Sequence, residues 1–157
     1  MTSIEDLTNV IIPHFCKYPL LTQKQADFEL FRRLVEFMNH KEHLTTEGLH
    51  KILSIRATIN KGLPKRLEAA FPNITPEPRP QVTNPTLESN SPEVKHWIAG
   101  FVSGEGCLFI KTSKSKTHRL GMSVALNFLV VQNVRDANLL ESFVQVFGCG
   151  SFSISSF

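Results

Sequence analysis

Cysteine is scarce in this sequence. Three occur in 157 residues, Cys16, Cys107 and Cys149, and they are far apart, odd in number and never arranged as a CxxC pair. Disulfide frameworks and cysteine-based zinc sites depend on closely spaced, usually even sets of cysteines. The sequence therefore suggests neither, and a reducing compartment is the simplest interpretation of three scattered thiols.

Long hydrophobic runs are also absent. No stretch of roughly 18 apolar residues occurs, which argues against a membrane-spanning helix, so no membrane partner is predicted. The first residues, MTSIEDLTNV, carry two acids and do not resemble a secretory signal or an arginine-rich transit peptide. With 41% hydrophobic and 20% charged residues, the chain has the composition of a globular protein with one core of ordinary size.

Acidic residues are missing from one long stretch. None occurs between Glu105 and Asp136, although the net charge of the whole chain is only +3. A local basic block in a nearly neutral chain suits a surface that faces a polyanion, and a solvated lysine-rich loop is the alternative. The basic residues of this stretch are Lys111, Lys114, Lys116, Arg119 and Arg135.

Proline is unevenly distributed. Residues 72–92 hold six of the nine prolines and show no apolar periodicity, which predicts a semi-extended linker. Apolar spacing before the linker predicts a helical segment. The first expected helix covers residues 3–18, with an end or kink at Pro13. The second begins with a Thr22–Gln25 capping box and ends near Asn39. The third runs from Thr45 or Thr46 to Gly62, and the fourth from Pro64 to Phe71.

One helix after the linker has two distinct surfaces. An apolar face follows i, i+3, i+4, i+7 spacing from Val94 to Val102, and small residues including Gly100 and Gly104 form a second surface. Two helical glycines cost about 1 kcal/mol each against alanine, and close approach of another backbone is a plausible gain. Gly106 is placed to end the helix as a left-handed C′ residue.

The last residue of this helix is an acid. Glu105 is expected at the negative end of the helix dipole, a conflict that a nearby cation would remove. Carboxylate and helix-end carbonyl oxygens are the ligands that Mg²⁺ or Ca²⁺ prefer. The alternative is an ordinary solvated surface glutamate after an amphipathic helix.

Beyond Gly106 the apolar period changes to two, which predicts a β-hairpin. Leu108, Ile110 and Thr112 share one side of the first strand, residues 113–121 form a polar turn, and a second strand follows. The alternating set from Met122 to Val130 is expected to face a core. A helix then starts near Asn133 and Asp136 and ends at Gly148, and residues 150–157 are expected to begin another strand.

The segment Ile98-Ala99-Gly100-Phe101-Val102-Ser103-Gly104-Glu105-Gly106 resembles the signature helix of the LAGLIDADG homing endonucleases. Residues 106–133 resemble the first hairpin of that fold, and residues 3–80 resemble the late helices of a preceding repeat in the single-chain, two-repeat branch. The resemblance implies an α+β fold of αββαββα repeats. It implies that residues 1–71 end a first repeat, 72–92 link the repeats, and 93–157 are a truncated second repeat.

The same resemblance implies site-specific, metal-dependent hydrolysis of both strands of double-stranded DNA, with Mg²⁺ as cofactor. Glu105 takes the catalytic and metal-ligating role, with the Gly104 carbonyl as a second metal ligand. Gln132 matches a polar position near the metals and waters. Gly100 and Gly104 correspond to the positions at which the helices of two repeats pack against each other.

DNA would be read by the outward face of the hairpin. Basic side chains contact phosphates or guanine edges, and serine and asparagine can donate and accept at base edges. The candidate residues are Lys111, Ser113, Lys114, Lys116, His118, Arg119, Ser123 and Asn127.

Two other functions fit the same features. The fold also hosts intron RNA maturases, whose basic surface would bind RNA, and a non-catalytic remnant would explain why no second helix of the xAGxxxGE type precedes Glu105. Because a complete site needs two acids, we expect the isolated chain to fold poorly, to cut little and to need the missing half of the protein. The resemblance further implies a mitochondrial location, since many relatives are encoded in mitochondrial introns.

Overall fold

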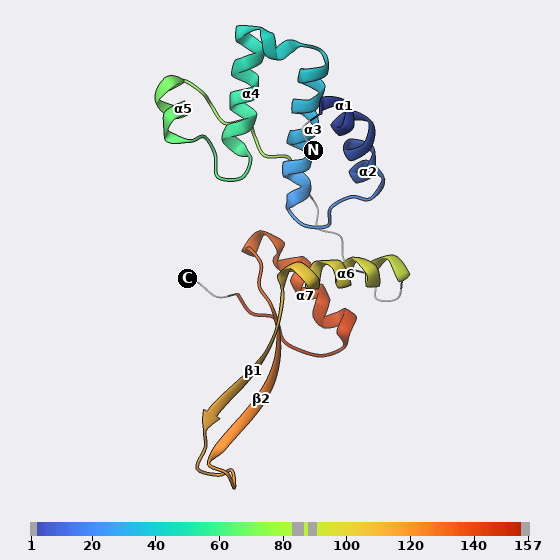
Figure 1. Cartoon of the computed structure of the whole chain (residues 1–157), viewed down its shortest axis with the longest axis vertical. Helices are drawn as coiled ribbons and strands as arrows, with labels where there is room; N and C mark the ends of the chain where they lie inside the picture. The colour runs from blue at the N-terminus through green and yellow to red at the C-terminus, as the bar shows by residue number, and fades with distance from the viewer. Residues whose placement is uncertain (1–2, 83–86, 88–90, 155–157) are drawn as a thin grey trace. The chain divides into compact units, whose positions relative to one another are not determined.

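The computed structural model describes residues 3–82, 87 and 91–154 of the chain. It divides into two compact units, residues Met1–Asn84 and Pro85–Phe157, and each is described by itself (Figure 1). No helix in these described ranges is long and apolar enough to cross a membrane.

In the described part of the first unit, all regular secondary structure is helical. The unit contains α1 (Ile4–Asp6), the π-helical turn η1 (Leu7–Ile11), α2 (Ile12–Lys17), α3 (Lys24–Asn39), the 3₁₀ turn η2 (Glu42–Leu44), α4 (Thr46–Thr58) and α5 (Lys65–Ala70). Thr45 caps α4 as expected, because its hydroxyl accepts the Gly48 N–H at 3.0 Å.

Several details of these helices bear on the sequence prediction, and one difference is that α4 ends at Thr58, before Gly62. Of the end or kink predicted at Pro13, the end does not occur, since the helix continues to Lys17, and the wider π-helical turn just before Pro13 accommodates its missing N–H. The Thr22–Gln25 capping box does not form because α3 begins at Lys24. The Thr22 hydroxyl accepts from the Lys24 N–H at 3.2 Å, and the Gln25 side chain accepts from the Leu20 N–H at 3.0 Å.

The core of the first unit lies between α3 and α4. Leu30 and Ile55 are 0% and 1% exposed, and Ile59 packs with them just after α4 ends. Leu34 and Phe37 of α3 close the cluster from the side. These two helices therefore form a closed apolar centre within one short segment of the chain.

The first half of the predicted linker is bound to these helices. Residues 74–82, which we call the strap, are held by several hydrogen bonds and two ion pairs. The Arg79 guanidinium contacts the Asp27 carboxylate at 2.6 Å, and Arg33 contacts Glu77 at 2.9 Å. The Glu77 N–H donates to the Ser54 carbonyl at 3.1 Å. The strap is thus part of the first unit rather than a free spacer.

The second unit joins two helices to a β-ribbon. It contains α6 (Pro92–Glu105), β1 (Gly106–Lys114), β2 (Met122–Val130), the 3₁₀ turn η3 (Val134–Asp136) and α7 (Ala137–Phe147). The strands are antiparallel, with Gly106 opposite Val130 and Lys114 opposite Met122. Figure 1 shows the ribbon running away from α6 and α7.

Aromatic rings hold α6, α7 and the base of β2 together. Trp97 stacks on Phe101 with ring centroids 4.8 Å apart, and Phe101 lies 5.7 Å from Phe143 of α7. Phe147 in turn meets Phe128 of β2 edge-on at 6.0 Å. The predicted apolar face of α6 is therefore used to fix the helix beside the start of the ribbon.

The ribbon itself has no core on its apolar face. Leu108 and Leu126 are 80% and 81% exposed, and Ile110 and Val124 are 68% and 66% exposed. The prediction that the Met122–Val130 set faces a core is wrong for most of the set, since Val124 and Leu126 are exposed, whereas Phe128, near the base of the ribbon, packs against the Phe147 ring of α7. An open apolar groove of about 540 Å³, lined by Ile98, Val102 and Phe128 among others, continues this unfilled surface toward α6.

The expected strand at the end of the chain does not form in its described part. Gly148 ends α7 in the left-handed conformation, with φ of 66°, as predicted. Residues 150–154 then have no strand structure because no partner strand pairs with them, and residues 155–157 lie outside the described residues.

Candidate active-site helix end and nucleic-acid interface

Glu105 is the last residue of α6, where the helix passes directly into β1. It is exposed rather than buried in apolar packing, and no hydrogen bond or ion pair within the described residues engages its carboxylate. An unpaired carboxylate at the negative end of a helix is electrostatically unfavourable. The side chain is therefore available to a cation or a polar ligand.

Gly106 is required by close packing and not by a left-handed turn. Its φ of −82° and ψ of 145° are extended, so the prediction of a C′ glycine is wrong. A Cβ at this position would lie 2.6 Å from both the Val102 carbonyl oxygen and its Cγ1. The Gly106 N–H donates to the Val102 carbonyl, and this contact lets the strand start immediately beside the acid.

Gln132 lies at the same end of the ribbon as Glu105. Strand β2 ends at Val130, whose partner Gly106 directly follows Glu105, and Gln132 comes two residues later in the chain. Gln132 is half-buried. The register thus brings the predicted acid and the predicted amide to one end of the hairpin.

The small-residue surface of α6 is open. An added Cβ at Gly100 or Gly104 would meet no atom of the described residues within 4 Å. The packing of the described residues therefore requires a glycine at neither position. The surface remains available for the close backbone approach that the sequence predicts.

The ribbon separates its apolar and polar residues by face. Because directly paired residues in an antiparallel ladder share a face, Lys111, Ser113, Ser123 and Asn127 lie together on the side opposite Leu108 and Leu126. Ser113 and Ser123 are paired and their hydroxyls are 2.9 Å apart. Lys114 differs from the prediction, since its pairing with Met122 places it on the apolar face.

The loop between the strands is shaped by its own hydroxyl groups. The Ser115 Oγ lies 2.7 Å from His118 Nδ1 and 3.2 Å from the Thr117 hydroxyl. The Gly121 N–H donates to the His118 carbonyl at 2.8 Å. Ser115 and Thr117 were not among the predicted site residues, although hydroxyls next to a histidine in a polar turn are a recognisable signal.

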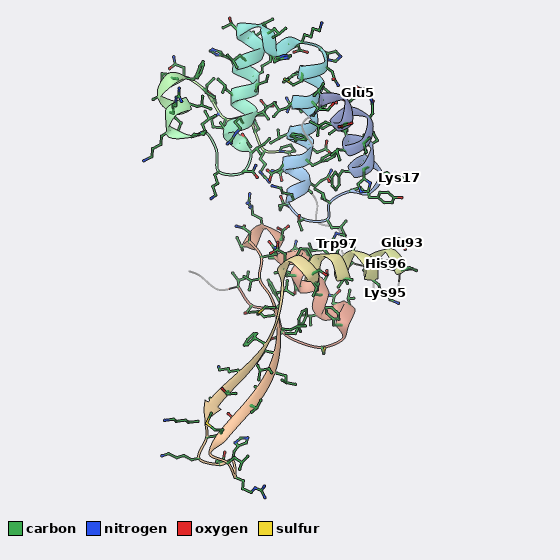
Figure 2. The ribbon with its side chains drawn as sticks, viewed as in Figure 1. Glu5, Lys17, Glu93, Lys95, His96 and Trp97 are labelled. Carbon is green, nitrogen blue, oxygen red and sulfur yellow. The ribbon has the colours of Figure 1, made fainter. Side chains whose placement is uncertain are left out.

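Positive charge gathers around this loop without compensation. Lys111, Lys116 and Arg119 are exposed and form no ion pair with an acid in the described part of the chain. Figure 2 shows nitrogen-tipped side chains projecting from the far end of the ribbon. The hairpin therefore presents a basic tip and a polar face, which suit a phosphate backbone and base edges.

The sequence pattern of one family, described as LAGLIDADG endonuclease, matches residues 1–35 and 98–156, which is more than half of the chain. The chain belongs to the LAGLIDADG endonuclease family. This LAGLIDADG chain is 41% identical over 155 residues to "Probable intron-encoded endonuclease 2" of Neurospora crassa, a match that covers 96% of the chain and 33% of that relative. A protein of Podospora anserina described as lying in ND4 intron 1 is 51% identical over 43 residues, covering 27% of this chain and 9% of that protein.

Solved LAGLIDADG structures share the fold. The I-SmaMI homing endonuclease bound to cleaved DNA matches with a TM-score of 0.87 and 42% identity, covering 98% of this chain and 50% of that one. I-LtrWI bound to target DNA matches with a TM-score of 0.86 and 42% identity, covering 96% of this chain and 49% of that one. The chain thus has the α+β LAGLIDADG fold and spans about half the length of these enzymes and a third of the N. crassa relative.

LAGLIDADG endonucleases generally depend on divalent metals, and the helix end offers one part of such a site. Glu105 supplies a carboxylate, and the last-turn carbonyls, including that of Gly104, lack partners further along the helix. However, the described residues contain no group of three or more His, Cys, Asp or Glu that could hold a metal. The donors fit a hard cation only as a shared site, completed by ligands from outside these residues.

Proposed function

We propose that this chain is part of a site-specific DNA endonuclease and carries one of the two acidic centres of the complete enzyme. The observation that carries the proposal is the position of Glu105, an exposed and unpaired carboxylate joined through Gly106 to a basic ribbon. Family membership and the names of the relatives support an endonuclease rather than an RNA maturase.

The domain organisation follows from the same proposal. Residues 1–71 end a first repeat, residues 72–92 connect the repeats, and residues 93–157 begin a second repeat. The exposed apolar face of the ribbon and the coverage of about half of each solved relative support this assignment. The missing half of the protein is then a required partner that covers this face and supplies the second acid.

If Mg²⁺ is the cofactor, the Glu105 carboxylate and the Gly104 carbonyl would hold it at this helix end. A bound divalent cation stabilises negative charge on the attacking and leaving oxygens of a phosphodiester. Gln132 orients a water at the same end of the ribbon through its side-chain amide. Gly100 and Gly104 admit the backbone of the partner helix, so that two carboxylates reach one place.

Binding of double-stranded DNA falls to the ribbon. The polar face with Lys111, Ser113, Ser123 and Asn127 enters the major groove, as β-ribbons do, and reads base edges. Phosphates are contacted by the residues near the tip, Lys114, Lys116, His118 and Arg119. The protein acts in the mitochondrion, a location supported by the intron-encoded relatives and the ND4 intron match.

The test is cleavage of the intronless form of the host gene in the presence of Mg²⁺, with the complementary half co-expressed. Replacing Glu105 with glutamine removes the negative charge but keeps the size, and we expect cleavage to fall at least about a hundredfold. The matched control is Glu93→Gln, which changes an acid in the first turn of the same helix (Figure 2) and leaves cleavage intact.

Four results would contradict parts of this proposal. Cleavage that is unchanged in Glu105→Gln removes this residue from the site. Preferential binding of the host intron RNA over DNA favours a maturase, and no cleavage under any condition favours a non-catalytic remnant. Efficient double-strand cleavage by the isolated chain would show that the missing half is not needed.

A further inference from the structure

The lysines and arginines of the first unit differ in whether they are paired with an acid. Lys24, Arg32, Arg33, Lys51 and Arg79 each lie within 4.0 Å of a carboxylate oxygen. Lys61, Lys65 and Arg66 are exposed, and none of them forms an ion pair with an acid in the described residues. Lys17, Lys41 and Arg56 also form no ion pair with an acid in the described residues, but they are isolated from one another in the sequence. Lys61, Lys65 and Arg66, by contrast, lie within six consecutive residues, 61–66, which we call the basic loop.

Helix α5 (Lys65–Ala70) does not stabilise the positive charges of the basic loop. Lys65 and Arg66 are the first two residues of α5, where a positive charge is opposed by the helix dipole. The nearest acid in the chain, Glu68, is exposed and in the same short helix. The arrangement weakens the local fold slightly, which points to a role outside the chain.

The basic loop is held in one conformation. Arg56 of α4 donates from Nη1 to the Gly62 carbonyl at 2.5 Å, and the Gly62 N–H donates to the Ile59 carbonyl at 3.2 Å. Gly62 has a φ of 75°, which a residue with a side chain rarely adopts. At the far end of α5, the Phe71 ring meets His50 of α4 edge-on at 6.1 Å. Binding at such a loop loses little conformational entropy.

From these observations we infer that the basic loop is a second phosphate-binding element for double-stranded DNA, separate in sequence from the β1–β2 ribbon. The inference rests on the proposed endonuclease function for the choice of DNA as the polyanion. Three exposed, unpaired cations on a rigid loop match the backbone of a duplex, which is contacted without regard to sequence.

The test measures the affinity of the full 157-residue chain for a DNA duplex of random sequence between about 50 and 200 mM salt. The triple change Lys61→Gln, Lys65→Gln and Arg66→Gln should reduce the slope of log affinity against log salt by about 2 to 3, since each phosphate contact contributes about 0.9. Affinity at low salt should fall by at least about tenfold. Thermal unfolding confirms that the variant is folded.

Two controls separate this inference from the proposed function. Lys51→Gln removes an exposed cation that is already paired with Glu47 at 3.0 Å, and the slope should stay unchanged. Neutralising Lys111, Lys116 and Arg119 in the ribbon should weaken binding through the proposed DNA-reading surface. If the ribbon variant loses affinity and the basic-loop variant does not, the inference fails and the endonuclease proposal stands.

Two further outcomes would contradict the inference. A chain that binds no duplex at all contradicts both the inference and the proposed DNA binding of the ribbon. A slope change that appears with single-stranded intron RNA and not with duplex DNA overturns the assignment of DNA as the partner of the basic loop.

Discussion

The helical unit and the β1–β2 ribbon differ in how far their apolar side chains are buried and their charged side chains are paired. In the helical unit, Leu30 and Ile55 are almost fully buried, and five cations are paired with carboxylates. In the ribbon, Leu108 and Leu126 are about four-fifths exposed, and the lysines near the tip form no ion pair in the described residues. The first region therefore has the properties of a self-sufficient fold, and the second has those of a surface that is completed by something else.

The largest test of this difference compares two leucines. Leu30→Ala removes a side chain with no exposed surface and should lower the free energy of unfolding by about 2–5 kcal/mol. Leu126→Ala removes one that is 81% exposed and should change it by less than about 0.5 kcal/mol. Urea unfolding of both variants measures the two values. Equal losses would show that the ribbon is packed in solution.

The pairing of Asp27 with the strap should contribute less. Burial alone would raise the pKa of Asp27, but hydrogen bonds and attraction from Arg79 and Lys24 lower it overall. Arg79→Ala leaves the largely buried carboxylate with a weaker partner and should cost about 1–3 kcal/mol. The exposed pair of Lys51 with Glu47 provides the comparison, and Lys51→Ala should change stability much less than Arg79→Ala, because solvent screens an exposed ion pair.

The ion pair between Asp27 and Arg79 also predicts that the free energy of unfolding depends on pH. Because the folded pKa of Asp27 lies below its unfolded value of about 4, its contribution to stability is complete above that pH and is lost as the pH falls through the folded pKa. Asp27→Asn should therefore flatten the fall in unfolding free energy below about pH 4. An identical pH profile in the variant would show that Asp27 is not linked to folding.

The last comparison concerns two glycines at the end of α6, whose substitutions should change stability in opposite directions. Gly106→Ala places a Cβ 2.6 Å from the Val102 carbonyl oxygen and should destabilise the chain by about 1–3 kcal/mol. Gly104→Ala meets nothing within 4 Å and should stabilise the helix by up to about 1 kcal/mol. If Gly104 packs against a partner helix in the complete enzyme, the same stabilised variant should lose cleavage there.

Sequence reasoning located most elements because they depend on local patterns. The hairpin strands, the Thr45 cap and the Gly148 stop were all predicted from periodicity or from single residues. Errors arose where distant contacts decide. Phe31 and Met38 belong to the apolar spacing of α3, yet they are 37% and 41% exposed, because the core forms around Leu30 on the side that meets α4.

In the candidate site, too, features set by local sequence were predicted and features set by three-dimensional packing were not. Glu105 was predicted from its position at the end of a recognisable helix, and it lies there exposed. The face of Lys114 depends on strand register, and the reason for Gly106 depends on a close approach to Val102. Neither could be derived from residue spacing, since both are properties of packing in three dimensions.

The strap changes where the chain can be divided. A fragment that stops at residue 71, before the prolines begin, would lose Glu77 and Arg79 and leave the carboxylate of Asp27 and the guanidinium of Arg33 without these partners. A fragment that extends through Val82 retains them, together with the hydrogen bond from Gln23 to the Val82 carbonyl. Gene fusions or split enzymes built from this protein should therefore place their junction beyond Val82.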